Sequence, residues 1–244
     1  MKRVLLGTGV VAAMLLGVSS AFASGVNLAW NNCASEGGTQ NRLFACNTNA
    51  GSNLLTCSFA LPADLLQVSG NELVLDLTTD PVPVPAWWDL KNAGSCRPLA
   101  LGANFIVNAA NITCIDWAAG QSAGGVGFYG PAPPDTMFHR RIKIAVAVPQ
   151  SALADLFAET EYFSCNVTIS NQKTVGTGAC TGCSVPACVV LNSVNVVTAL
   201  LTQEFLGAAT TPGSNLATWQ GQGPNCLQVS ARPATWGQLK ALYR

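Results

Sequence analysis

The chain has 244 residues, of which only 10% are charged, with 12 basic and 12 acidic side chains in balance. No basic stripe runs through the sequence, so we expect no nucleic-acid partner. Because charged residues usually make up about 25% of a protein, the polar surface here must consist mainly of Asn, Thr, Ser, Gln and Gly, as in many extracellular β proteins.

The first 23 residues have the pattern of a secretory signal peptide. Lys2 and Arg3 precede an apolar run over 4–18, and Ala21-Phe22-Ala23 forms a cleavage site. A membrane anchor is the alternative, but the run is shorter than the ~20 residues that span a bilayer. The sequence therefore predicts a signal peptide over 1–23 and one secreted domain over 24–244, extracellular or periplasmic. We expect no membrane association after cleavage.

Short segments that alternate apolar and polar residues, separated by Gly, Pro and Asn turns, follow the signal peptide. This spacing predicts an all-β fold, an antiparallel β-sandwich of jelly-roll or cohesin-like topology. Short helices are expected over 151–158, with Ser151 as N-cap, and over 235–244. The predicted strands span 25–30, 54–61, 72–79, 104–107, 124–129, 138–148, 161–170, 187–197 and 217–220.

The clearest pattern covers 161–197 and predicts a hairpin with a cysteine-rich tip. In its first arm, the period of two places Phe163 and Cys165 on one face and Tyr162 and Ser164 on the other. We expect this hairpin to join the early and late parts of the chain.

Ten cysteines, an even number in a secreted chain, predict up to five disulfides. Two of them, Cys57 and Cys165, are expected to face the core from neighbouring strands and to bond there. A Cys46–Cys57 bond is the main rival, and the roles of Cys180 and Cys183 are interchangeable at this stage. The full predicted set is Cys33–Cys46, Cys57–Cys165, Cys96–Cys114, Cys180–Cys188 and Cys183–Cys226.

The late cysteines have two alternatives to disulfides, a redox motif and a zinc site. Cys180-Thr-Gly-Cys183 is a C-x-x-C motif, but it lies in a Gly-rich loop and lacks the helix N-terminus that would make a redox thiolate. With Cys188 and Cys226 it could form a four-thiolate zinc site. Since an oxidising compartment favours disulfides, we predict a structural role, with no metal and no cofactor.

The candidates for chemistry or binding are few. In an extended chain the side chains of Trp87 and Trp88 would leave on opposite faces, so one can enter the core while the other stays near solvent, where it could bind a sugar ring. A core position is the favoured interpretation of these rings, because aromatic side chains supply large buried area. The only histidine, His139, has no partner motif for nucleophilic catalysis. Carboxylates that could support glycoside hydrolysis or bind Ca²⁺ are Asp76, Asp80, Asp89 and Asp116, but nothing places two of them across a cleft.

Several motifs resemble those of a group of uncharacterised secreted bacterial proteins. They include Trp30-Asn31-Asn32-Cys33, Trp87-Trp88 with Cys96-Arg97, and the ending Thr235-Trp236-Gly237 through Leu242-Tyr243-Arg244. The resemblance implies export from a bacterium and a Cys-rich β fold, and it implies no activity.

The sequence thus favours a non-enzymatic extracellular β-sandwich with a structural or binding role and no catalytic residue. The alternatives are a carbohydrate-binding or adhesion module that uses Trp87 and Trp88 and, less favoured, a secreted hydrolase. Expected partners are a surface glycan or another extracellular protein.

Overall fold

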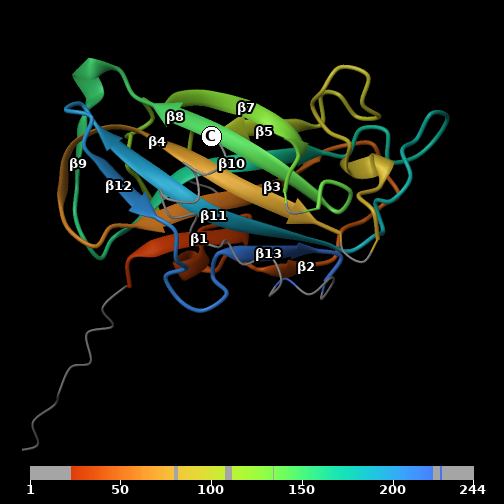
Figure 1. Cartoon of the computed structure of the whole chain (residues 1–244), viewed down its shortest axis with the longest axis horizontal. Coiled ribbons are helices and arrows are strands. Elements are labelled where there is room, and N and C mark those ends of the chain that lie inside the picture. The colour runs from red at the N-terminus through yellow and green to blue at the C-terminus, as the bar shows by residue number, and fades with distance from the viewer. Residues whose placement is uncertain (1–22, 80–81, 108–111, 134, 222–225, 227–244) are drawn as a thin grey trace, which may run out of the picture.

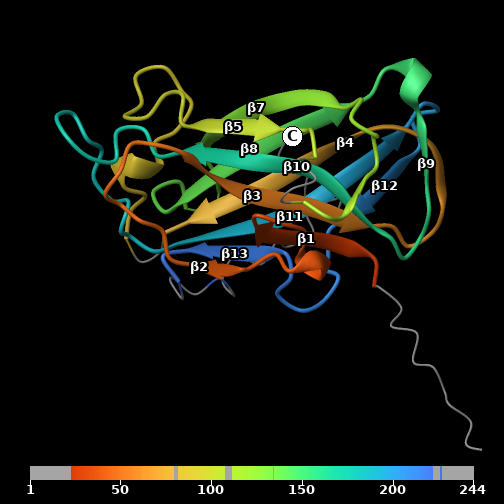
Figure 2. The same cartoon turned by 180° about the vertical axis from the view of Figure 1, so that it is seen from behind.

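The computed structural model describes residues 23–79, 82–107, 112–133, 135–221 and 226. Within these residues two β-sheets pack face to face, which confirms the predicted β-sandwich (Figures 1 and 2). The helical content here is three 3-10 turns, η1 (Ala34–Glu36), η2 (Ala86–Trp88) and η3 (Gln150–Ala152). None of the helices in this part of the chain is long and apolar enough to cross a membrane. The helix predicted over 235–244 and most of the predicted signal peptide lie outside the described residues.

The smaller sheet has the strand order β1-β3-β10-β5, with the short β6 parallel to β10. The central pairs are antiparallel, as the alternating sequence predicts. Its strands are β1 (Gly25–Trp30), β3 (Ser52–Ala60), β5 (Leu101–Asn104), β6 (Ile115–Asp116) and β10 (Glu161–Ser170).

The larger sheet has the order β2-β13-β11-β4-β8-β7, with β12 beside β11 and β9 beside β4. Its two longest strands, β4 and β11, pair along most of their length and form its middle. The strands are β2 (Asn41–Arg42), β4 (Leu65–Thr78), β7 (Ala123–Pro131), β8 (His139–Ala147), β9 (Ala154–Leu156), β11 (Ala187–Thr198), β12 (Gln203–Leu206) and β13 (Leu216–Trp219).

The core lies between the inner faces of the two sheets. Every second residue of the main strands is buried there, which is the physical reason for the alternating sequence. The small sheet supplies Leu55, Cys57 and Phe59 from β3, and the large sheet supplies Leu73 and Leu75 from β4, all completely buried.

A β-bulge in β10 changes the predicted faces of that strand. The pairing with β3 shifts register between Phe163 and Cys165, so Ser164 is the extra residue. As a result Tyr162 joins Cys165 in the main core, while Phe163 turns to the outer face of the small sheet. The prediction that Phe163 and Cys165 share a face is therefore wrong, because one inserted residue reverses the alternation.

Two further predictions about local structure are wrong. The arms of the predicted hairpin, β10 and β11, belong to different sheets, and the loop over 171–186 crosses between the sheets instead of turning back within one. The segment 151–158 is not a helix but the turn η3 followed by β9, which adds to the edge of β4 opposite Leu65 and Val68. In both places tertiary pairing overrides the local pattern.

The disulfides differ from the predicted set. The four bonds are Cys33–Cys114, Cys46–Cys183, Cys96–Cys180 and Cys188–Cys226. Three of the five predicted bonds, Cys33–Cys46, Cys96–Cys114 and Cys180–Cys188, joined cysteines that are close in sequence. The observed bonds join segments 38 to 137 residues apart.

Cys57 and Cys165 are free thiols, so the predicted bond between them is also wrong. The strand arrangement behind that prediction is nonetheless confirmed, since the two residues are direct partners across β3 and β10. Burial raises the pKa of the Cys57 thiol well above its ordinary value, and contact with Cys165 raises it further. Both side chains are 0% exposed, which makes them inert toward reagents in water.

We expect the folded protein to show no reactive thiol and the unfolded, unreduced protein to show two. Alkylation before and after unfolding, followed by peptide mass spectrometry, should place both labels on Cys57 and Cys165. A label on any other cysteine, or no label after unfolding, would contradict this assignment.

Candidate functional site

Trp87 and Trp88 are both completely buried, which agrees with the favoured core position and excludes the alternative in which one ring stays near solvent to bind a sugar. They lie in η2 rather than in an extended strand. In a 3-10 turn successive side chains do not point to opposite faces, and here both rings enter the core. Neither ring offers a flat surface to a sugar.

The two rings belong to an aromatic cluster at one end of the sandwich. Trp219 lies at its centre, with ring centroids 4.7 Å from Trp87, 5.3 Å from Trp88 and 3.9 Å from Phe44. The loop that carries Cys183 packs directly on this cluster. The backbone N–H of Trp87 donates to the Thr181 carbonyl in this loop (2.9 Å).

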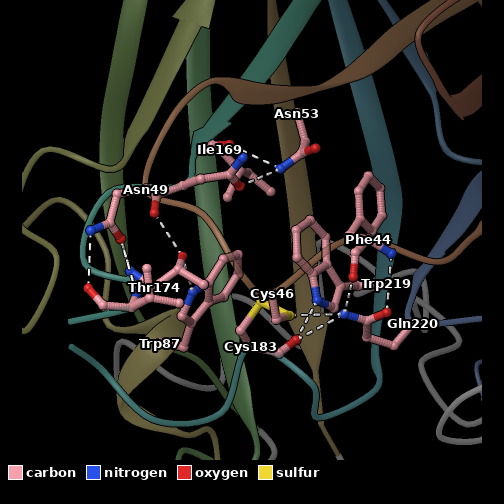
Figure 3. The surroundings of a disulfide bond; sticks show 12 residues. Phe44, Cys46, Asn49, Asn53, Trp87, Ile169, Thr174, Cys183, Trp219 and Gln220 are labelled. Carbon is pink, nitrogen blue, oxygen red and sulfur yellow. Dashed lines mark hydrogen bonds between the residues drawn. A yellow bond between two sulfur atoms is a disulfide. The ribbon is translucent and has the colours of Figure 1, made fainter.

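The Cys46–Cys183 disulfide closes this cluster, as Figure 3 shows. The Trp219 indole N–H donates to the Cys183 carbonyl (2.7 Å), and the Gln220 amide donates to the same carbonyl (3.2 Å) and to the Phe44 carbonyl (3.0 Å). The groups around the disulfide therefore satisfy one another and hold β2, β13 and the 171–186 loop together. Their arrangement is structural.

The C-x-x-C motif has no redox geometry. Cys180 is bonded to Cys96, and Cys183 is bonded to Cys46, so the two cysteines of the motif serve different disulfides. Of the described residues, no group of three or more His, Cys, Asp or Glu could hold a metal ion. His139 begins β8, where its backbone N–H donates to the Asp135 carbonyl (3.0 Å).

Three candidate carboxylates each serve a local structural contact. Both oxygens of Asp76 bind Arg141, at 2.7 Å each. Asp89 accepts from the backbone N–H of Cys96 (3.4 Å), and Asp116 accepts from two N–H groups of its own turn (2.9 and 2.8 Å). The fourth candidate, Asp80, lies outside the described residues. Asp76, Asp89 and Asp116 thus serve separate contacts and are not joined as a catalytic pair.

A pocket of about 430 Å³ lies at the start of β1. Its floor includes the buried Asn27, whose side-chain oxygen accepts from the hydroxyls of Ser214 (2.6 Å) and Thr210. Six of the ten lining residues carry a hydroxyl or an amide; the lining comprises Ala23, Asn27, Ala34, Ser35, Gly38, Gln40, Thr210, Thr211, Pro212 and Ser214.

Beneath the pocket lies the carboxylate of Glu161, only 8% exposed. One oxygen accepts from the Asn27 amide (2.7 Å) and the Ser58 hydroxyl (2.6 Å). The other accepts from the backbone N–H of Ser35 (3.1 Å) and from the Ser35 hydroxyl. The carboxylate thus joins β10, β3, β1 and η1 through neutral donors, which satisfy its charge in place of a cation.

Sequence reasoning missed this pocket because its lining comes from three separate segments, over 23–27, 34–40 and 210–214. The β10 bulge puts Phe163 and Glu161 on the outer face, and no sequence pattern marked that bulge. A detectable signal was present in β1 and β3, where Asn27 and Ser58 occupy outward positions that would normally meet solvent. Chemically, the pocket can offer hydrogen bonds to a polar ligand.

Replacing Glu161 with Ala is expected to lower the free energy of unfolding by about 3 kcal/mol, because buried donors on Asn27, Ser58 and Ser35 lose their acceptor. Glu161→Gln should cost less, since the amide retains one accepting oxygen. Urea denaturation measures both changes. The control, Glu204→Ala on β12, should change the free energy by no more than about 0.5 kcal/mol; an equal loss in both Ala variants would refute the role of Glu161.

Comparison with known proteins adds one structural similarity. The second type II cohesin module of the cellulosomal adaptor ScaA scaffoldin from Acetivibrio cellulolyticus has a TM-score of 0.31 and 8% sequence identity, over 77% of this chain and 98% of that chain. We transfer no site or activity from it. No protein-family model and no curated protein matches the sequence.

Proposed function

We propose that this chain is a non-enzymatic extracellular β-sandwich protein with a structural or binding role. The observation that carries the proposal is the use of its reactive groups: eight cysteines form disulfides and three candidate carboxylates hold single loops or strands. Four disulfides are typical of chains that fold and act in an oxidising environment. Bonds between distant segments restrict the unfolded chain and suit a protein exposed to harsh conditions.

Two measurements on the purified mature protein test this proposal. Hydrolysis assays over a panel of polysaccharides and esters should show no turnover. Digestion by a broad-specificity protease should be slow, and it should become fast after the disulfides are reduced. Turnover that disappears on substitution of one carboxylate would overturn the proposal, and so would equal digestion of the oxidised and reduced protein.

The pocket at the start of β1 favours a second candidate, a carbohydrate-binding or adhesion module. The hydroxyl and amide groups of its lining match the hydrogen-bonding groups of a sugar. Sugar binding in this pocket would not involve Trp87 or Trp88. A glycan array distinguishes the two candidates. Binding that weakens in Thr211→Val, which removes one lining hydroxyl at nearly constant volume, would support this candidate. Flat binding curves would remove it.

A further inference from the structure

The exposed large apolar side chains gather at the two ends of the molecule. The long axis of the sandwich is horizontal in Figure 1, with β9 and β12 at the left end and the loops over 82–100 and 171–186 at the right. Of the twelve such side chains in the described chain, nine lie at these ends. The left end has Leu66, Phe157, Leu200, Leu201 and Phe205, and the right end has Leu43, Val82, Leu99 and Met137.

The five side chains at the left end, here named the apolar tip, come from three segments that hydrogen bonds hold together. The Ala199 N–H donates to the Gln67 carbonyl (2.9 Å), which joins the β11–β12 turn to the start of β4. Leu65 pairs with Leu156, which brings Phe157 to the same end. Such a concentration of exposed apolar side chains is characteristic of an interaction surface.

The turn between β11 and β12 presents its two leucines in a fixed conformation. Leu200 and Leu201 are 80% and 79% exposed, and Leu201 has a φ of 61°, a region that favours Gly or Asn over a bulky residue. Thr198 holds this turn, since its carbonyl accepts from Leu201 (3.0 Å) and its hydroxyl accepts from the Thr202 N–H (3.1 Å). A leucine kept at a strained and fully exposed position needs a reason other than folding.

The apolar tip is rimmed by acidic residues alone. Its three segments, 61–69, 153–161 and 197–207, contain no Lys, Arg or His. Four of their carboxylates are exposed or half-exposed: Asp64, Asp155, Glu159 and Glu204. Like charge therefore opposes contact between two tips, and also contact with an anionic membrane.

The right end, here named the basic end, combines exposed apolar side chains with cations. Its exposed or half-exposed basic residues are Arg42, Lys91, Arg140 and Lys173. Besides Asp76, which is paired with Arg141, the described carboxylates of this end are Asp89 and Asp135. They accept from the N–H groups of Cys96 (3.4 Å) and Met137 (3.0 Å), as Asp64 and Asp155 accept from backbone N–H groups at the apolar tip. The two ends therefore differ in their cations, four against none.

From this complementarity we propose that the apolar tip of one molecule docks on the basic end of a second copy. The inference rests on the structural role proposed above and specifies its partner, which is the chain itself. The contact is heterologous because two different surfaces meet, so it leaves one free tip and one free end and can propagate into linear chains. A contact of this size, below about 1,200 Å², is typical of weak association.

Sedimentation velocity of the mature protein over increasing concentration tests the proposal. The weight-average mass should roughly double when the concentration reaches the dissociation constant, expected in the high micromolar to millimolar range for so small a contact. Raising the ionic strength to about 1 M, where the Debye length is about 3 Å, should shift the association to higher concentration.

The decisive variants alter one end at a time. Leu200→Ser with Leu201→Asn removes the apolar tip, and Asn tolerates the positive φ, so this variant should fold at least as well as the wild type. Leu99→Ser with Met137→Ser alters the basic end. Each variant alone should remain monomeric, while their equimolar mixture should form dimers and nothing longer, because it contains one intact pair of ends. Ile106→Ser, at an exposed position on the side of the sandwich, should associate like the wild type.

A wild type that stays monomeric at every concentration overturns the inference, and so does association that survives the loss of the tip. Binding to phosphatidylcholine vesicles without self-association would assign the tip to a membrane and also overturn it. These outcomes leave the proposed non-enzymatic role intact, because that role is tested separately by the turnover and protease assays.

Discussion

Replacing Cys46 and Cys183 together by serine is expected to lower the free energy of unfolding by about 5 kcal/mol. The bond spans 137 residues, the widest separation of the four, and in the chain-entropy account a longer closed loop restricts the unfolded state more strongly. A loss of this size approaches the entire stability of many domains, about 5–15 kcal/mol. Urea denaturation of the otherwise oxidised protein, followed by far-UV circular dichroism, measures it.

The matched control removes Cys188–Cys226 in the same way. This bond spans only 38 residues, so the expected loss is about 4 kcal/mol. Both variants lose two sulfur atoms and keep the remaining three disulfides, so their comparison isolates loop length and local packing. A smaller loss for the Cys46–Cys183 variant than for the control would show that neither the long loop nor the aromatic cluster around that bond stabilises the fold as argued.

The strands could be predicted from sequence because each buries one face. Alternation with a period of two located β1 and β10 to the residue, and it located most of β3, β8 and β11. This signal is local: a strand half-buried in a sandwich shows its buried face in its own sequence, whatever its neighbours are. Strand order carries no such local signal, which is why β10 and β11 looked like a hairpin although they belong to different sheets.

The candidate site and the disulfides could not be predicted because they depend on contacts between distant segments. Glu161 meets Asn27 and Ser35, more than a hundred residues away, through a bulge that no residue pattern marks. The disulfides also depend on contacts between distant segments, since the cysteines nearest in sequence are not the ones that lie nearest in space. The expectation that Trp87 and Trp88 point to opposite faces was wrong for a different reason. It assumed an extended backbone, and the segment forms a 3-10 turn instead.

The sequence marks Arg97 only as part of the Cys96-Arg97 motif and predicts no role for it, yet its side chain is completely buried. Its guanidinium lies 3.7 Å from the centre of the Trp87 ring and donates to the carbonyls of Trp87 (2.7 Å), Gln172 (2.9 Å) and Ser170. Burial lowers the pKa of Arg97 to about 10, so the group is still charged at neutral pH. Backbone oxygens and an aromatic face thus take the place of a carboxylate partner.

Arg97→Ala is expected to lower the free energy of unfolding by about 5 kcal/mol, because it leaves the buried Trp87 carbonyl and two half-buried carbonyls without this donor and opens a cavity beside Trp87. Arg97→Lys should lose about 3 kcal/mol, since one ammonium cannot reproduce the planar fork that reaches all three oxygens. Both are measured by urea denaturation with the disulfides intact. The control is Arg140→Ala. This arginine is half-exposed, and its hydrogen bonds to described residues go to the carbonyls of Thr136 and His139, so its removal should cost no more than about 0.5 kcal/mol. If Arg97→Ala cost no more than this control, the buried guanidinium would not be what joins η2 to the end of β10 and the loop that follows it.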